Sequence, residues 1–316
     1  MTTRVLRGCL MKNNRGDRKN DRRSLRGKVL ISFDVEEFDL PREHGGEISL
    51  AEGVKVSAKG LAKVLDMLKR CGVRATFFVT GNFALTAPEM VERIVRDGHE
   101  VGCHGVDHFN PCEGDVARSR EIVAGVVEKY VENSVENGEE KSGVGNTVKG
   151  EAQTDAVRTK VVGWRQPRMF KIDYKELKKN GFLYDTSVNP AWVPGRYNHR
   201  DVPLRPFVRE EIVEVPVSVA SSVRVPLFWL ALHLFPVALY TQGAKMALRK
   251  TGYFATYFHP WEFSDELMGY GMVPGYIKRN SGDKLVARLE KVIMELLKAG
   301  CEFETYGDFV EGWKYA

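Results

Sequence analysis

Two histidines four residues apart, His104 and His108, carry the clearest chemical signal in this chain. Two imidazoles at this spacing can reach one cation where the backbone turns or coils between them. Upstream, Asp34 and Glu36 follow an apolar run and alternate by two, so on a strand both point to the same side. Carboxylate oxygen and imidazole nitrogen together suit zinc or another divalent transition metal. The sequence therefore predicts a metal site built from two distant segments.

The elements around these residues alternate between strand and helix patterns. We expect buried parallel strands over three runs: 28–33, 74–79 and 100–103. Apolar residues at helical spacing predict helices over 58–71 and 87–96. This order is typical of a parallel α/β sheet or barrel, where ligands gather at the carboxyl ends of strands. All four candidate residues follow predicted strands, so one fold assumption brings them together.

The rest of the chain continues this pattern less regularly. We expect helices over 116–130, 173–180 and 283–298 and strands over 211–217, 253–259 and 301–305. A segment at about 131–157 has no hydrophobic period and is predicted to be a flexible insertion. Residues 189–206, rich in proline, arginine and aromatic residues, are expected to form a long ordered loop.

The most apolar stretch of the chain is 226–240. It is too short for a comfortable membrane span, and it contains His233 and Pro236. We interpret it as a core helix or a hydrophobic lip beside the site, with partial embedding in a membrane as the alternative.

Composition narrows the class of protein. With 316 residues, 43% hydrophobic and 28% charged, the chain can form one large α/β domain or two small ones. Residues 1–27 are rich in arginine and lysine and are expected to be a disordered basic arm. A solvated tail is the favoured interpretation and contact with phosphates or an anionic membrane the alternative. No nucleic-acid motif is present, so we expect no nucleic-acid partner.

The cysteines and the N-terminal segment bear on the compartment. Five cysteines are scattered without a CxxC pair, which favours a reducing environment. No apolar core segment follows the basic residues, so a secretory signal is not expected and a cytoplasmic location is. Cys103 adjoins His104 and could be a soft donor, but a buried small residue at a strand end is the favoured interpretation.

Three further motifs follow in order along the chain: Trp164-Arg165-Gln166-Pro167-Arg168, Glu214-Val215-Pro216-Val217-Ser218 and Tyr257-Phe258-His259-Pro260-Trp261. Taken singly, each has a structural explanation: an arginine stacked on tryptophan, a strand with an edge proline, and a hydrogen-bonded core histidine. Their order together with the first two motifs carries more information than any one of them.

In that order the motifs resemble those of the polysaccharide deacetylase family, also called the NodB-homology or carbohydrate esterase 4 group. The segment with Asp34 and Glu36 resembles its first motif, in which one acid is the base and a second binds metal. His104-Gly-Val-Asp-His108 resembles the HxxxH motif that completes the metal triad. Arg165-Gln-Pro resembles the third motif, and Phe-His259-Pro the last, whose histidine is the general acid.

The resemblance implies a distorted (β/α)7-type barrel over 28–316 that holds one divalent metal. Zinc is the first expectation, with cobalt, nickel or manganese as alternatives, bound by three side chains: Glu36, His104 and His108. Asp34 is implied as the base, held by Arg165, and His259 as the acid. The implied reaction is hydrolysis of an N-acyl group, most often N-acetyl, on an amino sugar or a glycan precursor, which could be lipid-linked.

The match departs from the family pattern in two places. Val35 separates Asp34 from the next acid, and Glu37 or Asp39 could compete with Glu36 for the metal. The fourth motif, an aspartate that tunes the catalytic histidine, has no match, and Asp185 is not assigned to it. Two other functions stay open: an allantoinase-like or other amidase acting on a non-sugar linear or cyclic C–N bond, and a non-catalytic metal-binding protein.

Overall fold

The computed structural model describes residues 25–110, 114–136, 160–193, 197–220 and 223–314. Nearly all of the expected basic arm, and the expected insertion from residue 137 onward, lie outside these ranges.

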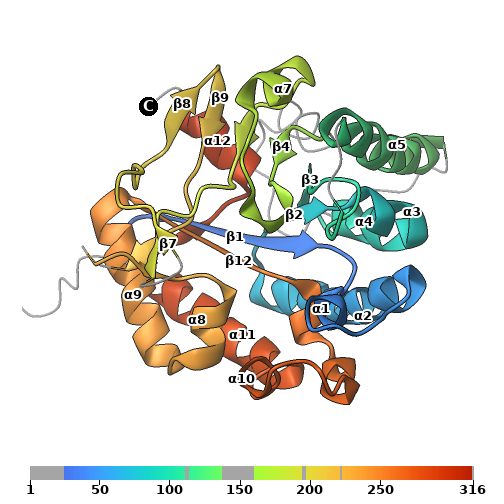
Figure 1. Ribbon diagram of the computed structural model, residues 1–316. Helices are drawn as coiled ribbons and strands as arrows, with labels where there is room; N and C mark the ends of the chain where they lie inside the picture. Colours follow the sequence, from blue (N-terminus) through green and yellow to red (C-terminus); the bar gives the residue numbers. More distant parts are fainter. Residues whose placement is uncertain (1–24, 111–113, 137–159, 194–196, 221–222, 315–316) are drawn as a thin grey trace, which may run out of the picture.

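A curled sheet forms the centre of the fold (Figure 1). In the described residues the main run of the sheet consists of parallel strands in the spatial order β12 (Tyr253–Phe258), β1 (Lys28–Val35), β2 (Thr76–Val79), β3 (Glu100–Cys103), β4 (Gly163–Trp164), β5 (Tyr184–Asp185) and β9 (Ile212–Glu214). β8 (Phe207–Arg209) pairs antiparallel with β9, and β13 (Glu302–Phe303) pairs in parallel with β1. Beyond β9 the chain returns to β12, where the Ser218 N–H donates to the Ala255 carbonyl oxygen at 2.9 Å. The expected distorted α/β barrel is confirmed.

Helices cover the outside of this sheet (Figure 1). The longer ones are α2 (Leu50–Cys71), α4 (Pro88–Arg96), α5 (Asp115–Glu136), α9 (Val237–Thr251) and α11 (Asp283–Lys298). Helix α12 (Tyr306–Lys314) packs instead against the inner side of the sheet, through Tyr306 and Val310. The shorter ones are α1 (Leu40–Glu43), α3 (Gly81–Thr86), α7 (Tyr174–Lys179), α8 (Trp229–Leu234) and α10 (Gly275–Lys278), with 3-10 turns η1 (Pro167–Met169), η2 (Pro260–Phe263) and η3 (Asp265–Gly269). No helix in the described ranges is long and apolar enough to cross a membrane.

Strand β1 shows how the sheet positions the site. Its odd-numbered residues Val29 to Val35 pack in the large core cluster under the helices. Leu30 belongs to the inner cluster with Tyr184 and Tyr306, which lies on the opposite side of the strand. Because side chains alternate along a strand, Asp34 shares the inner side with Leu30, at the carboxyl end of β1.

Several boundaries differ from the sequence expectations. α2 begins at Leu50 rather than 58, because Ser49 caps it: its Oγ accepts the Glu52 N–H at 3.2 Å. α5 continues to Glu136, since no glycine or proline follows its hydrophobic pattern until Gly138. β9 ends at Glu214, two residues before Pro216, which lacks a ladder donor.

The apolar stretch 226–240 forms two helices rather than one, α8 and α9, because Pro236 separates them. The expected loop 189–206 contains a short hairpin of β6 (Trp192–Val193) and β7 (Tyr197–Asn198). A second small ribbon joins β10 (Val219–Ala220) and β11 (Val225–Pro226) just before α8.

Candidate metal centre and active site

Asp34 lies within β1, one residue before its end, and is held by Arg165 from the end of β4. Arg165 Nη1 donates to Asp34 Oδ1 at 2.7 Å and to Ser32 Oγ at 2.9 Å. Burial lowers the pKa of Arg165, but the Asp34 carboxylate outweighs this effect and raises it. The guanidinium also packs over the rings of Phe78 and Tyr257, at 4.6 and 5.0 Å from their centroids. A permanently charged arginine therefore fixes the Asp34 carboxylate at the rim of the barrel interior.

Glu36, His104 and His108 converge on one point. All three are buried, and each can offer a ligand atom within 4.8 Å of the others. The Glu36 Oε2 lies 3.3 Å from His104 Nε2 and 3.1 Å from His108 Nε2. This oxygen is buried and has no hydrogen-bond partner among the described residues. An orphaned buried carboxylate oxygen facing two imidazole nitrogens fits a divalent cation that binds all three.

The second nitrogen of each imidazole is already engaged. His104 Nδ1 lies 2.8 Å from the carbonyl oxygen of Arg165, and His108 Nδ1 lies 2.8 Å from Asp39 Oδ2. With a proton on Nδ1, each ring can offer the lone pair of Nε2, the nitrogen nearer Glu36, to a cation. Metal-binding histidines generally donate their other ring N–H to a carboxylate or a backbone carbonyl oxygen. These two hydrogen bonds therefore support the interpretation of the three residues as a metal site.

The electrostatics of the triad favour positive charge. Burial alone would raise the pKa of Glu36, but the charges of His108 and His259 outweigh burial and hold it well below its ordinary value. Burial lowers the pKa of His108, whereas Glu36 and Asp39 raise it to about 9. A divalent cation would supply the positive charge that this cluster of carboxylates attracts.

The neighbouring acids have other partners. Glu37 accepts hydrogen bonds from Thr80 Oγ1 at 2.8 Å and from the His108 N–H at 3.2 Å, so it holds the loop that carries His108. Asp39 binds His108 Nδ1 and receives Arg168 Nη2 at 3.4 Å. Glu36 is therefore the acid that faces both imidazoles, as expected.

Cys103 lies in the hydrophobic core, and burial raises the pKa of its thiol to about 12. Its expected place, as a buried small residue at a strand end, is confirmed.

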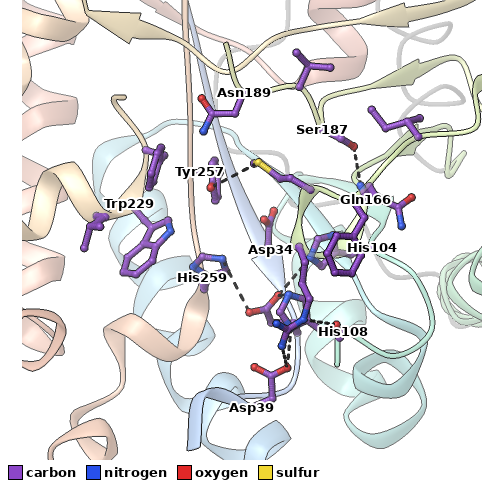
Figure 2. Close-up of a pocket in the computed structure, with 18 of the residues that line it drawn as sticks. Asp34, Asp39, His104, His108, Gln166, Ser187, Asn189, Trp229, Tyr257 and His259 are labelled. Carbon is purple, nitrogen blue, oxygen red and sulfur yellow. Dashed lines mark hydrogen bonds and ion pairs between the residues drawn. The ribbon is translucent and has the colours of Figure 1, made fainter. Parts of the chain in front are cut away.

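His259 follows β12 and lies opposite Asp34 in the same cavity (Figure 2). Its Nε2 is 4.0 Å from Glu36 Oε1, and its Nδ1 is 2.8 Å from Glu262 Oε1. Burial lowers the pKa of His259, but Glu36 and Glu262 outweigh burial and raise it to about 9. Trp261 Nε1 donates to Glu36 Oε1 at 3.0 Å, which joins this segment to the triad.

Glu262 is the site residue that the sequence did not reveal. Its carboxylate lies against the His259 imidazole. The fourth motif, an aspartate that tunes the catalytic histidine, has no match elsewhere in the sequence. The turn η2 brings Glu262 back onto His259, three residues earlier, so its Oε1 accepts both the backbone N–H and Nδ1. The sequence does contain a signal for Glu262: a carboxylate that follows a His-Pro pair, three residues after the histidine. Asp185, which was left unassigned, binds Ser187 instead.

A cavity of about 620 Å³ opens over these groups (Figure 2). Phe228, Trp229, Tyr257 and Trp261 give it an aromatic wall on the β12 and α8 side. On the other side, Figure 2 shows Gln166 and Ser187 from the loops after β4 and β5, and Asn189 lies at the top, above Tyr257. The residues predicted to carry chemistry therefore share one cavity, except that Arg165 lies behind Asp34.

Comparisons with known proteins agree with this arrangement. The model of the family described as polysaccharide deacetylase matches residues 51–135, which include both histidines of the triad. A peptidoglycan-N-acetylglucosamine deacetylase of Listeria monocytogenes is 51% identical over 45 residues, 14% of this chain and 10% of that protein. A peptidoglycan deacetylase of Helicobacter pylori is 32% identical over 88 residues, 27% of this chain and 30% of that protein. The matches thus span less than a third of the length of these two relatives.

The similarity of fold extends further than the similarity of sequence. A crystal structure of a Mycobacterium smegmatis protein with the provisional name polysaccharide deacetylase superimposes with a TM-score of 0.51 at 19% identity. The superposition covers 90% of this chain and 89% of the other. Asp34, Glu36, Arg165 and His259 lie outside the family-model match, so their roles depend on the geometry described above.

Proposed function

We propose that the chain is a metal-dependent hydrolase of the polysaccharide deacetylase family. It would remove an N-acyl group, first of all N-acetyl, from an amino sugar of a glycan or glycan precursor. The observation that carries this proposal is the buried Glu36–His104–His108 triad in one cavity with Asp34 and His259. We further propose that residues 28–316 make up the catalytic domain.

Glu36, His104 and His108 would hold the cation, and the nitrogen and carboxylate donors favour zinc, with cobalt, nickel or manganese as alternatives. When bound, such an ion makes a water more acidic and polarises the acyl carbonyl. The hydrogen bonds of His104 to Arg165 and of His108 to Asp39 keep both ligands oriented in advance.

Asp34 takes the proton of the attacking water. Arg165 occupies Oδ1, and because Asp34 lines the cavity we assign its other oxygen, Oδ2, to accept the proton. The buried guanidinium holds the carboxylate in one orientation, which a general base requires.

His259 donates a proton to the leaving amine. The carboxylate of Glu262 holds Nδ1, so Nε2 is the atom that faces the cavity and Glu36. With its pKa raised to about 9, the imidazole is protonated at neutral pH and can act as the general acid.

The experiment is a comparison of acetate release by the wild-type protein and by Asp34→Asn. N-acetylated chitooligosaccharides and peptidoglycan fragments are the substrates, and allantoin is the non-sugar control. We expect release from an N-acetylated sugar and a loss of about 100-fold or more in the variant, with metal content unchanged. Equal rates in both proteins, or hydrolysis of allantoin alone, would contradict the proposal.

A further inference from the structure

Glu262 is a carboxylate with partners on both oxygens. Its Oε1 faces His259, and its Oε2 lies 2.7 Å from Nε2 of His233. Glu262 is fully buried and His233 is 1% exposed. Because a buried carboxylate oxygen without a donor is destabilising, the His233 contact is needed to keep Glu262 in place.

His233 comes from α8, in the apolar stretch before Pro236, 29 residues before Glu262. The same helix contributes Trp229, whose ring packs edge-on against the rings of His233 and His259 at 5.8 and 5.5 Å. At its C-terminal end the helix is tied down, since Asn280 Nδ2 donates to the His233 carbonyl oxygen at 2.6 Å. The position of His233 is therefore fixed independently of the metal triad.

The second nitrogen of His233 gives the direction of the hydrogen bond. Nδ1 is buried and has no partner among the described residues. A proton there would be an unpaired buried donor, so the ring fits best with its proton on Nε2, donated to Glu262. The chain of contacts then runs from His233 Nε2 through both Glu262 oxygens to His259 Nδ1.

We propose that His233 is a positioning residue that clamps Glu262 from behind and so fixes the orientation of the His259 imidazole toward the cavity. The expected effect of His233 on turnover rests on the proposed function. The contacts from His233 through Glu262 to His259 do not depend on that function. His233 holds the Glu262 carboxylate in one orientation, just as Glu262 holds the His259 imidazole. An apolar segment that would otherwise only line the cavity thereby supports the proposed acid.

The test uses two substitutions at one position. His233→Leu removes the donor and keeps an apolar side chain, whereas His233→Gln keeps an N–H near the place of Nε2. We expect kcat for acetate release to fall about 10- to 100-fold in the leucine variant, with KM and zinc content unchanged, and to recover largely in the glutamine variant. His99→Leu is the control, because His99 is equally buried but bonds to the Ala75 N–H away from the cavity.

A second measurement is independent of activity. In the zinc-loaded protein labelled with ¹⁵N-histidine, the His259 Nδ1 proton, assigned by its loss in His259→Gln, reports the bond to Glu262. It should shift or exchange faster with solvent in His233→Leu, as in Glu262→Gln, and stay in place in His233→Gln and His99→Leu. A signal unchanged in His233→Leu would overturn the inference. An inactive wild-type protein in which the signal responds as expected would instead count against the proposed function alone.

Discussion

Arg165 contacts two parts of the site at once: its Nη1 lies 2.7 Å from Asp34 Oδ1, and its carbonyl oxygen lies 2.8 Å from His104 Nδ1. The side chain therefore orients the proposed base while the backbone orients a proposed metal ligand. A substitution of Arg165 removes the side-chain contact with Asp34 but keeps the backbone contact with His104. Mutation can therefore test the two contacts separately.

Replacing Arg165 should reduce activity more strongly than it reduces metal binding. Arg165→Met leaves the Asp34 carboxylate buried without its cation, which costs about 3–5 kcal/mol of stability. Arg165→Lys restores the charge but not the fork that reaches Ser32, Asp34 and Thr186, so we expect it to recover stability in part and activity little. Urea unfolding, metal analysis and acetate release on both variants check this. Full activity in Arg165→Met would contradict the assigned role.

Asp39 should act on the metal through His108. Asp39→Asn weakens the hydrogen bond to His108 Nδ1, so we expect metal affinity to fall about 10- to 100-fold. Glu43→Gln is the matched control, because Glu43 binds Arg168 Nη1 at 2.9 Å, whereas Asp39 binds both Arg168 Nη2 and His108 Nδ1. Competition with a chromogenic chelator measures both affinities. A greater loss in the Glu43 variant than in the Asp39 variant would show that Arg168, not Asp39, orients the ligand.

Gly105 should be essential to the turn between the two histidines. Its φ is +73°, and an added Cβ would lie 2.7 Å from Pro167 Cγ and 2.8 Å from Asp115 Oδ2. Gly105→Ala should therefore cost about 1–3 kcal/mol of unfolding free energy and displace His104 and His108. Gly98→Ala has a similar φ of +81° but no atom within 4 Å of the new Cβ, so it should cost less and keep the metal. Equal metal loss in both variants would rule out the steric explanation.

The buried carboxyl pair Asp185 and Glu214 should make stability depend on pH. Burial raises the pKa of Glu214 well above its ordinary 4.5, and the nearby Asp185 raises it further. The folded state then holds a proton that the unfolded state releases above about pH 4.5, so this contribution to stability is present at low pH and lost as pH rises toward the folded-state pKa. The slope is about 1.4 kcal/mol per pH unit per proton.

Glu214→Gln cannot release that proton. Urea unfolding from pH 5 to 8 should therefore show a smaller fall in stability for the variant than for the wild-type protein. Titrating groups other than Asp185, which interacts with Glu214, act on both proteins alike, so the difference between the two curves reports on this carboxyl pair. Parallel curves would mean that Glu214 is ionised in the folded protein.

The sequence predicted those parts of the site that follow from short-range patterns, such as the alternation of side chains along a strand. Alternation along the strand predicted Asp34 and Glu36 on one side, and the strand-end rule predicted that they lie near His104 and His108, with which they share the cavity. Helix α11 and strand β3 begin and end where their apolar patterns do, and the resemblance pointed to His259 and Arg165.

The rest depends on contacts between distant segments or on turns. Glu262 reaches His259 only because η2 folds back after Pro260, and no periodic pattern predicts such a turn. His233 looked like part of an apolar helix, and its polar partner became visible only when α8 packed beside η2. The antiparallel strand β8 and the inner contacts of Tyr306 from α12 likewise depend on tertiary packing.

The most direct test of the central claim is metal content measured together with acetate release, before and after chelation, for the wild-type protein and His104→Ala. The geometry predicts one metal ion per wild-type chain, activity that chelation removes and added zinc restores, and neither metal nor activity in the variant. A wild-type protein that retains no metal, or that releases acetate undiminished after chelation, would contradict it.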